Sequence, residues 1–418
     1  MSGPWVEEPP ADGESFARFA ALARRQNCVW LDTATGEGKS ILASDPFQII
    51  RAKGSQIQVV NSAGTRTLFG NPFAVLETEL ARQSGNGAAI GYFGYDLKNF
   101  IEKLPARAGD DIGLPDLWFG FYSKLRVGAA ARGSPPLPVN PQDRHGGRPR
   151  QSNFTPATYR AAVLRAKEYI AAGDIYQVNL SQRFQCEVSA PAPEVYLALR
   201  AANPAPYCVY LDIGDAQILS SSPECFLKID GRQVITRPIK GTRPRATDPA
   251  ELLASPKDNA ELLMITDLER NDLGRVCEYG SVHVPELVRV ESYATVHHLV
   301  ATVAGTLRSA VSHVGCVRAC FPGGSITGAP KIRAMQIIDE LEPHARGIYT
   351  GAIGYFGFDG HSDFNIAIRT VVQQGRRLTF HAGGGIVADS EADAEYAETL
   401  AKAQGIFNAL DQLRLRQR

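Results

Sequence analysis

The stretch AGGGIVADSEADAEYAETLAK, residues 382–402, joins three consecutive glycines to a charged segment with helical spacing. Glu391, Glu395, Glu398 and Lys402 recur at the intervals that place side chains on one helical face. Such a run of charges is by itself typical of a solvated face. The glycines change this interpretation, because they expose backbone N–H groups and let a ligand approach the chain closely. The stretch therefore predicts an anion held beside a hard cation at the start of a helix.

Upstream of this stretch, segments of helical and strand character alternate. Thr155 and Pro156 have the N-cap and N1 character of a helix start, and Gly173 is predicted to end that helix. Residues 175–184 then alternate with a period of two, as a half-buried strand does. The polar positions of this segment, Gln177 among them, fall on one side. We therefore expect the strand to present a polar face.

Composition divides the chain into three regions. Residues 1–127 are strand-rich, with short apolar segments between turns. Residues 128–154 are rich in Gly, Pro and Arg without apolar periodicity and are interpreted as a linker or long loop. Residues 155–410 carry most of the candidate chemistry. GYFGYD (91–96) resembles GYFGFD (354–359), which indicates two strands lining two packed sheets, or a chance recurrence.

Charge and cysteine content exclude several classes of protein. The 418 residues include 44 Lys+Arg and 44 Asp+Glu, and this balance argues against a nucleic-acid binder. No apolar run approaches a membrane span, and the N-terminus lacks the pattern of a signal peptide. The seven cysteines include no Cys-x-x-Cys pair and are typical of reduced thiols in a cytoplasmic protein. Cys316 and Cys320, one helical turn apart, are interpreted as helix packing.

A second glycine-rich segment, FPGGSITGAPK (321–331), precedes a predicted helix. The N-terminal amides of that helix and the hydroxyl of Thr327 are suited to a carboxylate or a phosphate. The spacing of a Walker A loop is absent.

Four further residues have both a structural and a functional interpretation. Glu261 lies among apolar residues and is either exposed or a metal ligand directed inward. Lys240, at the predicted end of a strand, is either a surface residue or a nucleophile in an anion pocket. Glu224 follows a polar turn, and His298 is a core or orienting histidine. The residues alone leave these alternatives open.

Nine ordered blocks within residues 155–405 resemble the chorismate-utilising enzymes. That family includes anthranilate synthase component I, aminodeoxychorismate synthase component I, isochorismate synthase and salicylate synthase. The blocks are GDIYQVNLSQRF, SPECF, PIKGTRPR, KDNAELLMITDLERNDLGRV, VHHLV, FPGGSITGAPKIRAMQIIDELEP, YTGAIGY, NIAIRT and AGGGIVADSEADAEYAETLAK. The resemblance implies an α/β fold in which two packed β-sheets form a sandwich flanked by helices. VWLDT (29–33) lies where relatives bind tryptophan, and Trp30 either packs against that pocket or partly occludes it.

The resemblance also implies a magnesium site. Glu261 and Glu398 would hold Mg²⁺, with Glu395 close by, and the ion would bind the ring carboxylate of chorismate. Thr327 and the glycines of 383–385 would bind the same end of the substrate. These glycines are Gly383, Gly384 and Gly385.

Other roles follow from the same resemblance. Arg369 and Tyr349 would take the enolpyruvyl carboxylate. Lys402 would add positive charge. Glu224 would be the general acid near the C4 hydroxyl, and His298 would orient the ring region.

Two positions separate the branches of the family. Water-using members resemble one another in placing a lysine base where this chain has Gln177, and glutamine is no base but can hydrogen-bond ammonia. At Lys240, anthranilate synthases resemble PIAGT, whereas many aminodeoxychorismate synthases have PIKGT, as this chain does. The resemblance therefore implies amination of chorismate at C4, toward p-aminobenzoate and folate, through a covalent adduct of Lys240.

Two alternatives remain, and one partner is implied. Amination at C2, as in anthranilate synthase, would predict alanine at position 240. A non-catalytic chorismate sensor would predict loss of Glu224, Glu261 or Glu398, and all three are present. No cysteine lies in a G-x-C-x-G elbow, so ammonia is expected from a separate glutamine amidotransferase subunit.

Overall fold

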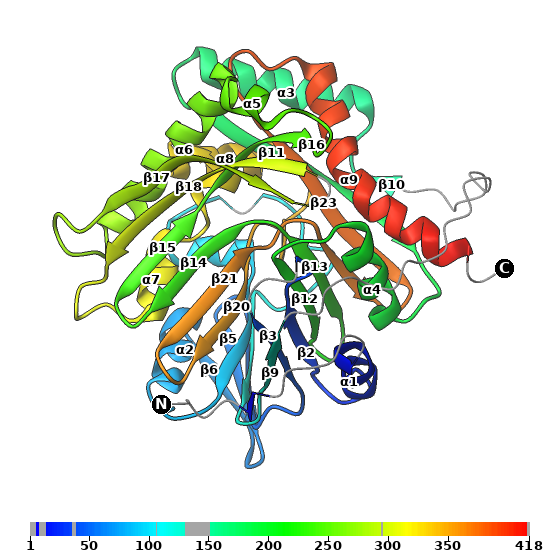
Figure 1. The fold of residues 1–418 in the computed structure, drawn as a ribbon, viewed down its shortest axis with the longest axis vertical. Coiled ribbons are helices and arrows are strands. Elements are labelled where there is room, and N and C mark those ends of the chain that lie inside the picture. The colour runs from blue at the N-terminus through cyan, green and yellow to red at the C-terminus, as the bar shows by residue number, and fades with distance from the viewer. Residues whose placement is uncertain are drawn as a thin grey trace.

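The computed structural model describes residues 6–7, 14–35, 39–105, 107–129, 151–293 and 296–415. In these residues the chain forms two large β-sheets (Figure 1). Sheet 1 contains, in spatial order, β1 (Val6–Glu7), β9 (Arg126–Ala129), β3 (Lys39–Ala43), β2 (Val29–Asp32), β12 (Tyr207–Asp212), β13 (Gln217–Ser222), β22 (Thr370–Gln374), β23 (Arg377–Ile386), β11 (Gln177–Glu187) and β10 (Gln151–Ser152), with β19 (Gly328–Ala329) paired to β11.

Sheet 2 contains the other strands of the described residues. Its order is β16 (Ile239–Pro244), β18 (Val296–Thr306), β15 (Gln233–Arg237), β14 (Cys225–Asp230), β21 (His361–Ile366), β20 (Ala352–Gly357), β7 (Ala88–Phe93), β8 (Leu117–Tyr122), β4 (Gln48–Lys53), β5 (Gln56–Asn61) and β6 (Gly64–Phe69), with β17 (His283–Ser292) paired to β18. An apolar cluster that includes Val29 and Val209 of sheet 1 and Ile90 and Ile353 of sheet 2 joins the two sheets. The predicted α/β sandwich of two packed sheets is confirmed.

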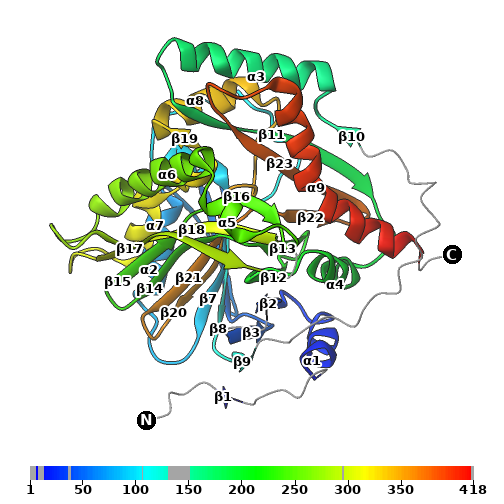
Figure 2. The ribbon, with the colours of Figure 1, turned by 45° about the horizontal axis from the view of Figure 1, so that its top comes forward.

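Helices cover the outer faces of both sheets (Figures 1 and 2). They are α1 (Glu14–Leu22), α2 (Pro72–Leu80), α3 (Pro156–Ala171), α4 (Ala192–Ala202), α5 (Pro249–Leu253), α6 (Pro256–Gly274), α7 (His313–Cys320), α8 (Lys331–Leu341) and α9 (Ala392–Leu415). Apolar side chains of α1, α4 and α9 pack with sheet 1, and those of α2 and α7 pack with sheet 2. Two 3₁₀ segments, Tyr95–Phe100 and Gly324–Ile326, complete the helical elements of the described residues.

The predicted start of α3 is confirmed. The Thr155 hydroxyl accepts from the Thr158 amide, Pro156 is the first helical residue, and Gly173 follows the helix with a φ of +80°. The predicted strand at 175–184 is β11, which extends from Gln177 to Glu187.

The two long sequence regions share both sheets. Strands from residues 1–127 lie in sheet 1 and in sheet 2, and strands from 155–410 complete each of them. Of the segment 128–154, residues 130–150 lie outside the described part of the chain. The two ends of the segment 128–154 contain strand residues, contrary to the predicted linker or loop. Residues 128–129 are the last two of β9, and residues 151–152 form β10.

The two glycine-aromatic segments are neighbours in one sheet, so the expectation that they line two different sheets is wrong. β7 and β20 pair antiparallel, with Gly91 directly opposite Gly354. A Cβ atom at Gly91 would lie 1.9 Å from the carbonyl oxygen of Trp118, and one at Gly354 would lie 2.0 Å from that of Asp363. Glycine is therefore required where these strands approach their neighbours closely.

Gly91→Ala is expected to lower the free energy of unfolding by about 1–3 kcal/mol, because the new methyl group meets backbone rather than a movable side chain. Urea denaturation measures the change. Gly274→Ala is the control, since a Cβ there would meet nothing within 4 Å. Equal stability of Gly91→Ala and the wild type would contradict the close approach.

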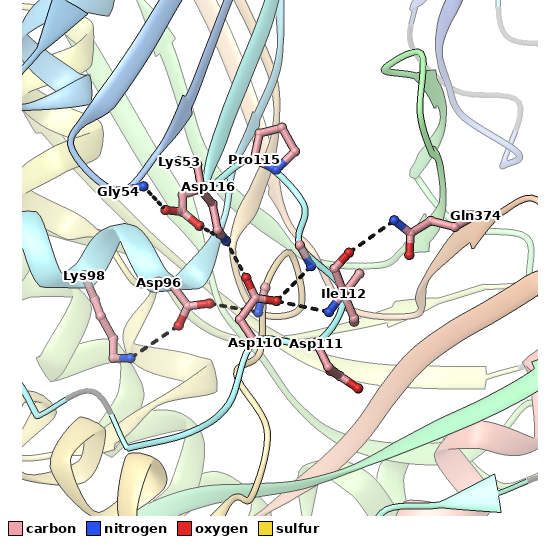
Figure 3. Close-up of polar contacts among 12 residues, drawn as sticks. Lys53, Gly54, Asp96, Lys98, Asp110, Asp111, Ile112, Pro115, Asp116 and Gln374 are labelled. Atoms are coloured by element: carbon pink, nitrogen blue, oxygen red, sulfur yellow. Dashed lines mark hydrogen bonds and ion pairs between the residues drawn. The ribbon is translucent and has the colours of Figure 1, made fainter.

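The loop that precedes β8 joins the two sheets (Figure 3). Lys53 of β4 donates to Asp110 at 2.5 Å and to Asp116 at 2.8 Å. On the other side, Gln374 Nε2 of β22 donates to the Ile112 carbonyl at 3.2 Å. The loop therefore connects sheet 2 and sheet 1 through hydrogen bonds to both.

All seven cysteines lie in the described part of the chain, and each is a buried free thiol. Cys316 and Cys320 lie on α7 in the core beneath sheet 2, which agrees with a packing role. Within the described residues, none of the helices has both the length and the apolar character needed to cross a bilayer.

Candidate active site

The glycines of residues 383–385 lie near the end of a strand of sheet 1. They belong to β23, where Gly383, Gly384 and Gly385 pair with Ser181, Leu180 and Asn179 of β11. A Cβ atom at Gly385 would lie 2.0 Å from Gln177 Nε2 and 3.2 Å from Glu261 Oε1. The missing side chain at Gly385 therefore leaves room for the polar groups of Gln177 and Glu261.

Glu261 of α6 faces this strand and is not fully exposed. Its Oε1 accepts from Gln177 Nε2 at 2.8 Å and lies 3.0 Å from Lys240 Nζ. Burial alone would raise the pKa of the Glu261 carboxyl, but the Lys240 ammonium and the Gln177 amide outweigh burial and lower it. Glu261 is therefore an ionised carboxylate directed inward.

Lys240 is the second residue of β16, so its predicted place at the end of a strand is wrong. Only 12% of its side chain is exposed, and Nζ also donates to the Ser325 carbonyl at 3.2 Å. This lysine is therefore largely buried and is not a surface residue.

The charged face of α9 approaches the same glycine strand. A Cβ atom at Gly384 would lie 3.2 Å from Glu398 Oε1 and 3.3 Å from Glu395 Oε2. Lys402 Nζ lies 2.6 Å from Glu398 Oε1 and donates to the Gly383 carbonyl at 3.0 Å. Glu395 accepts from the Ser390 hydroxyl at 2.6 Å, and burial raises the pKa of its carboxyl.

The donor atoms at this site are of the type that a magnesium ion binds. Glu261, Glu395 and Glu398 supply carboxylate oxygens from two helices beside adjacent glycines, and oxygen ligands are those that Mg²⁺ prefers. Within the described residues, no group of three or more His, Cys, Asp or Glu side chains is close enough to hold a metal by itself. Such a site leaves coordination positions to water and substrate, as Mg²⁺ sites usually do.

Glu224 follows a buried strand end rather than a polar turn, because Ser220, Ser221 and Ser222 are all buried in β13. Its amide donates to the Ser222 hydroxyl at 3.3 Å, and its carbonyl accepts from Ile366. Burial raises the pKa of the Glu224 carboxyl, against the effects of the Ser325 side chain and of the Lys240 cation. A carboxyl with a raised pKa is suited to proton donation.

His298 of β18 is buried, and its Nδ1 lies 3.0 Å from Thr242 Oγ1 and 3.3 Å from the Gly241 carbonyl. No described residue hydrogen-bonds its Nε2. Burial, together with the Arg369 cation, lowers the pKa of His298 to about 4. The imidazole is therefore neutral at pH 7, and its Nε2 atom has no hydrogen-bond partner among the described residues.

The buried neutral state of His298 predicts a pH dependence of stability. Its folded pKa of about 4 lies below the ordinary value of 6.5, so protonation of the unfolded chain below pH 6.5 favours unfolding. From pH 7 to pH 5 the wild type is expected to lose about 2 kcal/mol more stability than His298→Gln. Urea denaturation at the two pH values checks this difference. Equal losses in the two proteins would contradict the neutral state.

Arg369 lies near His298, whose pKa its charge lowers, and Tyr349 is buried beside His381. Arg369 has a φ of +49°, an uncommon conformation for a residue other than glycine, and burial lowers the pKa of its guanidinium. No carboxylate of the described residues forms an ion pair with it. The Tyr349 ring stacks on His381, with centroids 5.0 Å apart. A guanidinium without a carboxylate partner among the described residues is suited to bind a carboxylate of a ligand.

Thr327 is fully buried, and its hydroxyl donates to the Gly323 carbonyl at 3.0 Å. Its carbonyl accepts from the Asn179 amide of β11 at 2.8 Å. The structure therefore places the Thr327 main chain beside β11, while its hydroxyl proton is used within its own loop.

Sequence reasoning missed two groups at the site. The Asn179 Oδ1 atom is buried, lies on the same face of β11 as Gln177 and has no partner among the described residues. The alternating pattern of residues 175–184 was a sufficient signal for this residue. Glu269 of α6 accepts from Thr236 Oγ1 at 2.6 Å, and burial together with Asp272 raises the pKa of its carboxyl to about 8. Nothing in the sequence distinguished Glu269 from its charged neighbours.

A cavity of about 1100 Å³ lies beside the VWLDT segment and is lined by Leu31 and Thr33 among others. Trp30 packs on the other side of β2, with its ring 4.7 Å from that of Phe19 and 5.7 Å from that of Tyr196. The Trp30 side chain is therefore a core residue beside α1 and does not occlude the cavity.

Residues 26–408 of the sequence match the family of chorismate binding enzymes. The chain belongs to this family. It is 41% identical to aminodeoxychorismate synthase component 1 of Salmonella typhimurium over 410 residues, which cover 89% of each chain. It is also 41% identical to anthranilate synthase component 1 of Thermus thermophilus over 379 residues, which cover 83% of this chain and 82% of that protein.

A solved relative has the same fold as this chorismate binding enzyme. The crystal structure of anthranilate synthase component I from Streptococcus pneumoniae superposes with a TM-score of 0.77 at 33% identity, covering 88% of this chain and 92% of that one. The chain is therefore a chorismate-utilising enzyme. Relatives that carry two different activity names match it at the same identity, so overall identity does not distinguish between these activities.

Proposed function

We propose that this chain is an aminodeoxychorismate synthase component 1, which converts chorismate and ammonia into 4-amino-4-deoxychorismate on the route to p-aminobenzoate and folate. The observation that carries the proposal is the position of Lys240. Its side chain is largely buried, its amine lies 3.0 Å from Glu261, and Glu261 in turn contacts Gln177. Amination at C2 with loss of pyruvate requires no lysine nucleophile, whereas a covalent route to C4 does.

The covalent route divides one displacement into two. After its ammonium gives one proton to solvent, the amine of Lys240 attacks C2, the two ring double bonds shift, and the C4–O bond breaks. Glu224, whose carboxyl pKa is raised by burial, gives its proton to the departing hydroxyl, which leaves as water. Ammonia then attacks C4, the double bonds shift back, and the C2–N bond breaks to release Lys240. The proton that the new C4 ammonium loses returns to Glu224.

Gln177 supports ammonia rather than water as the nucleophile. Its Nε2 is bound to Glu261, and its Oε1 is buried without a partner among the described residues. An amide oxygen accepts a hydrogen bond from ammonia but does not take a proton from water at neutral pH. Gln177 is therefore proposed to hold ammonia near the ring without activating water.

Both carboxylates of chorismate would have counter-charges at this site. Mg²⁺ held by Glu261 and Glu398, with Glu395 close by, would neutralise the ring carboxylate, and Lys402 adds positive charge beside Gly383. Arg369 and Tyr349 would receive the enolpyruvyl carboxylate. His298 would accept or donate one hydrogen bond as a neutral imidazole.

The ammonia is proposed to come from a separate glutamine amidotransferase subunit in the cytoplasm. The relatives that match the chain are named component 1, which implies a second component for those proteins. Free ammonium at high pH should also support turnover.

Pyruvate release tests the proposal. The protein is incubated with chorismate, Mg²⁺ and ammonium, and pyruvate is measured with lactate dehydrogenase while chorismate consumption is followed. Ammonium-dependent consumption of chorismate without pyruvate is the expected result. One pyruvate per chorismate would assign the chain to C2 amination, the activity of an anthranilate synthase.

A further inference from the structure

Both carboxylates proposed to hold Mg²⁺ are neutralised by lysines of the same chain. Glu261 Oε1 lies 3.0 Å from Lys240 Nζ, and Glu398 Oε1 lies 2.6 Å from Lys402 Nζ. The two pairs differ in solvent access. The side chains of Glu398 and Lys402 are each 48% exposed, whereas those of Glu261 and Lys240 are 24% and 12% exposed. The Lys240 pair is therefore less screened by water and the stronger of the two.

Resting on the function proposed above, we infer that Lys240 is the internal counter-ion of Glu261 and that Mg²⁺ displaces it. A carboxylate carries one negative charge, so a divalent cation beside Glu261 and an ammonium on the same carboxylate repel each other. This repulsion arises whichever of the two Glu261 carboxylate oxygens binds the metal. Lys240 therefore opposes metal binding, and metal binding releases Lys240 from Glu261.

The release has a consequence for the order of events. Lys240 is held by two acceptors, Glu261 Oε1 and the Ser325 carbonyl at 3.2 Å. An amine engaged in both contacts is not directed at a substrate. Loss of the Glu261 contact leaves the side chain free to turn toward C2 of the ring. The metal thus couples its own binding to the availability of the nucleophile.

Titration calorimetry with Mg²⁺ at constant ionic strength, without chorismate, tests this competition. Lys240→Gln is expected to bind Mg²⁺ at least about tenfold more tightly than the wild type, a ratio that corresponds to ~1.4 kcal/mol. Lys240→Arg keeps the positive charge and is expected to remain near the wild type. Lys331→Gln is the matched control, because Lys331 is also 12% exposed and forms an ion pair at 2.5 Å with Asp272, which is not one of the carboxylates proposed to hold Mg²⁺. Melting temperatures verify that each variant is folded.

Acylation of lysines provides a second readout. Acetic anhydride labelling followed by peptide mass spectrometry is expected to show more modification of Lys240 at saturating Mg²⁺, with no change at Lys331. Labelling of Lys240 that does not respond to Mg²⁺ would contradict its release from Glu261.

The outcomes separate this inference from the proposed function. Unchanged or weaker Mg²⁺ binding by Lys240→Gln, or an equal gain in Lys331→Gln, would overturn the competition. In that case loss of Mg²⁺ binding in Glu261→Gln would still uphold the metal site of the proposed function. If Glu261→Gln binds Mg²⁺ as the wild type does, the metal lies elsewhere, and both the metal site and the competition are wrong.

Discussion

Lys240→Ala is expected to lower the rate of chorismate amination at C4 by at least about 10³-fold, equivalent to ~4 kcal/mol of transition-state stabilisation. The physical reason is the loss of the amine that would form the bond to C2. Without it, ammonia must displace the C4 hydroxyl in one difficult step. The rate is measured as ammonium-dependent loss of chorismate with saturating Mg²⁺, so that any change in metal affinity does not limit turnover.

Lys240→Arg separates nucleophilicity from charge. The guanidinium keeps the cation beside Glu261 but remains protonated and is a poor nucleophile. We expect this variant to be as inactive as Lys240→Ala. Full activity in either variant would exclude a covalent adduct at this position. Activity in Lys240→Arg alone would reduce the role of Lys240 to that of a positive charge.

Glu261→Gln is expected to abolish Mg²⁺-dependent turnover, with a loss of about 10³-fold or more, because a neutral amide is a weaker ligand than a carboxylate and the metal would neutralise the ring carboxylate. Glu398→Gln is expected to have a loss of similar size. Initial rates across a Mg²⁺ titration measure both effects. A rate that recovers at high Mg²⁺ would indicate weakened binding of the metal, and a rate that stays low would indicate a lost contact in the transition state.

Glu391→Gln is the control for the second substitution. Glu391 is exposed and lies immediately before α9, on the helical face that the sequence assigned to Glu395 and Glu398. The side chains of Glu395 and Glu398 contact Ser390 and Lys402 rather than the side chain of Glu391. Retained activity in Glu261→Gln or Glu398→Gln would remove that residue from the set of metal ligands.

Local sequence signals predicted the elements that carry the site. The hydroxyl of Thr155 and the ring of Pro156 act within one helical turn, so the start of α3 follows from residues next to each other. Alternation in residues 175–184 is also local, and it placed Gln177 and Ser181 on the polar face of β11. In the structure these two residues bond to Glu261 and Glu342.

Long-range pairing was beyond these signals. Gly91 and Gly354 are far apart in the chain, and their repeat fitted two sheets as well as one. Only the carbonyl oxygens of Trp118 and Asp363, which come from other strands, explain why both positions need glycine. The same limit applies to Lys240. The sequence identified it as a residue of interest, but its contact with Glu261 depends on how β16 packs beside α6.

Buried charges were the least predictable part of the site. Glu269, with a carboxyl pKa raised to about 8, has the same local pattern as exposed acidic residues of α6 such as Asp267. Its environment is set by Thr236 of β15 and by Asp272 one helical turn away. Burial of this kind arises from tertiary packing and leaves no mark in the spacing of charged residues.

The position of nitrogen in the product tests the central claim most directly. The protein is incubated with chorismate, Mg²⁺ and ¹⁵N-labelled ammonium, and the product is analysed by mass spectrometry and NMR. Addition of one ¹⁵N at C4, with the enolpyruvyl group retained, is the predicted result. Labelled anthranilate, with ¹⁵N at C2 and free pyruvate, would contradict C4 amination and the role assigned to Lys240.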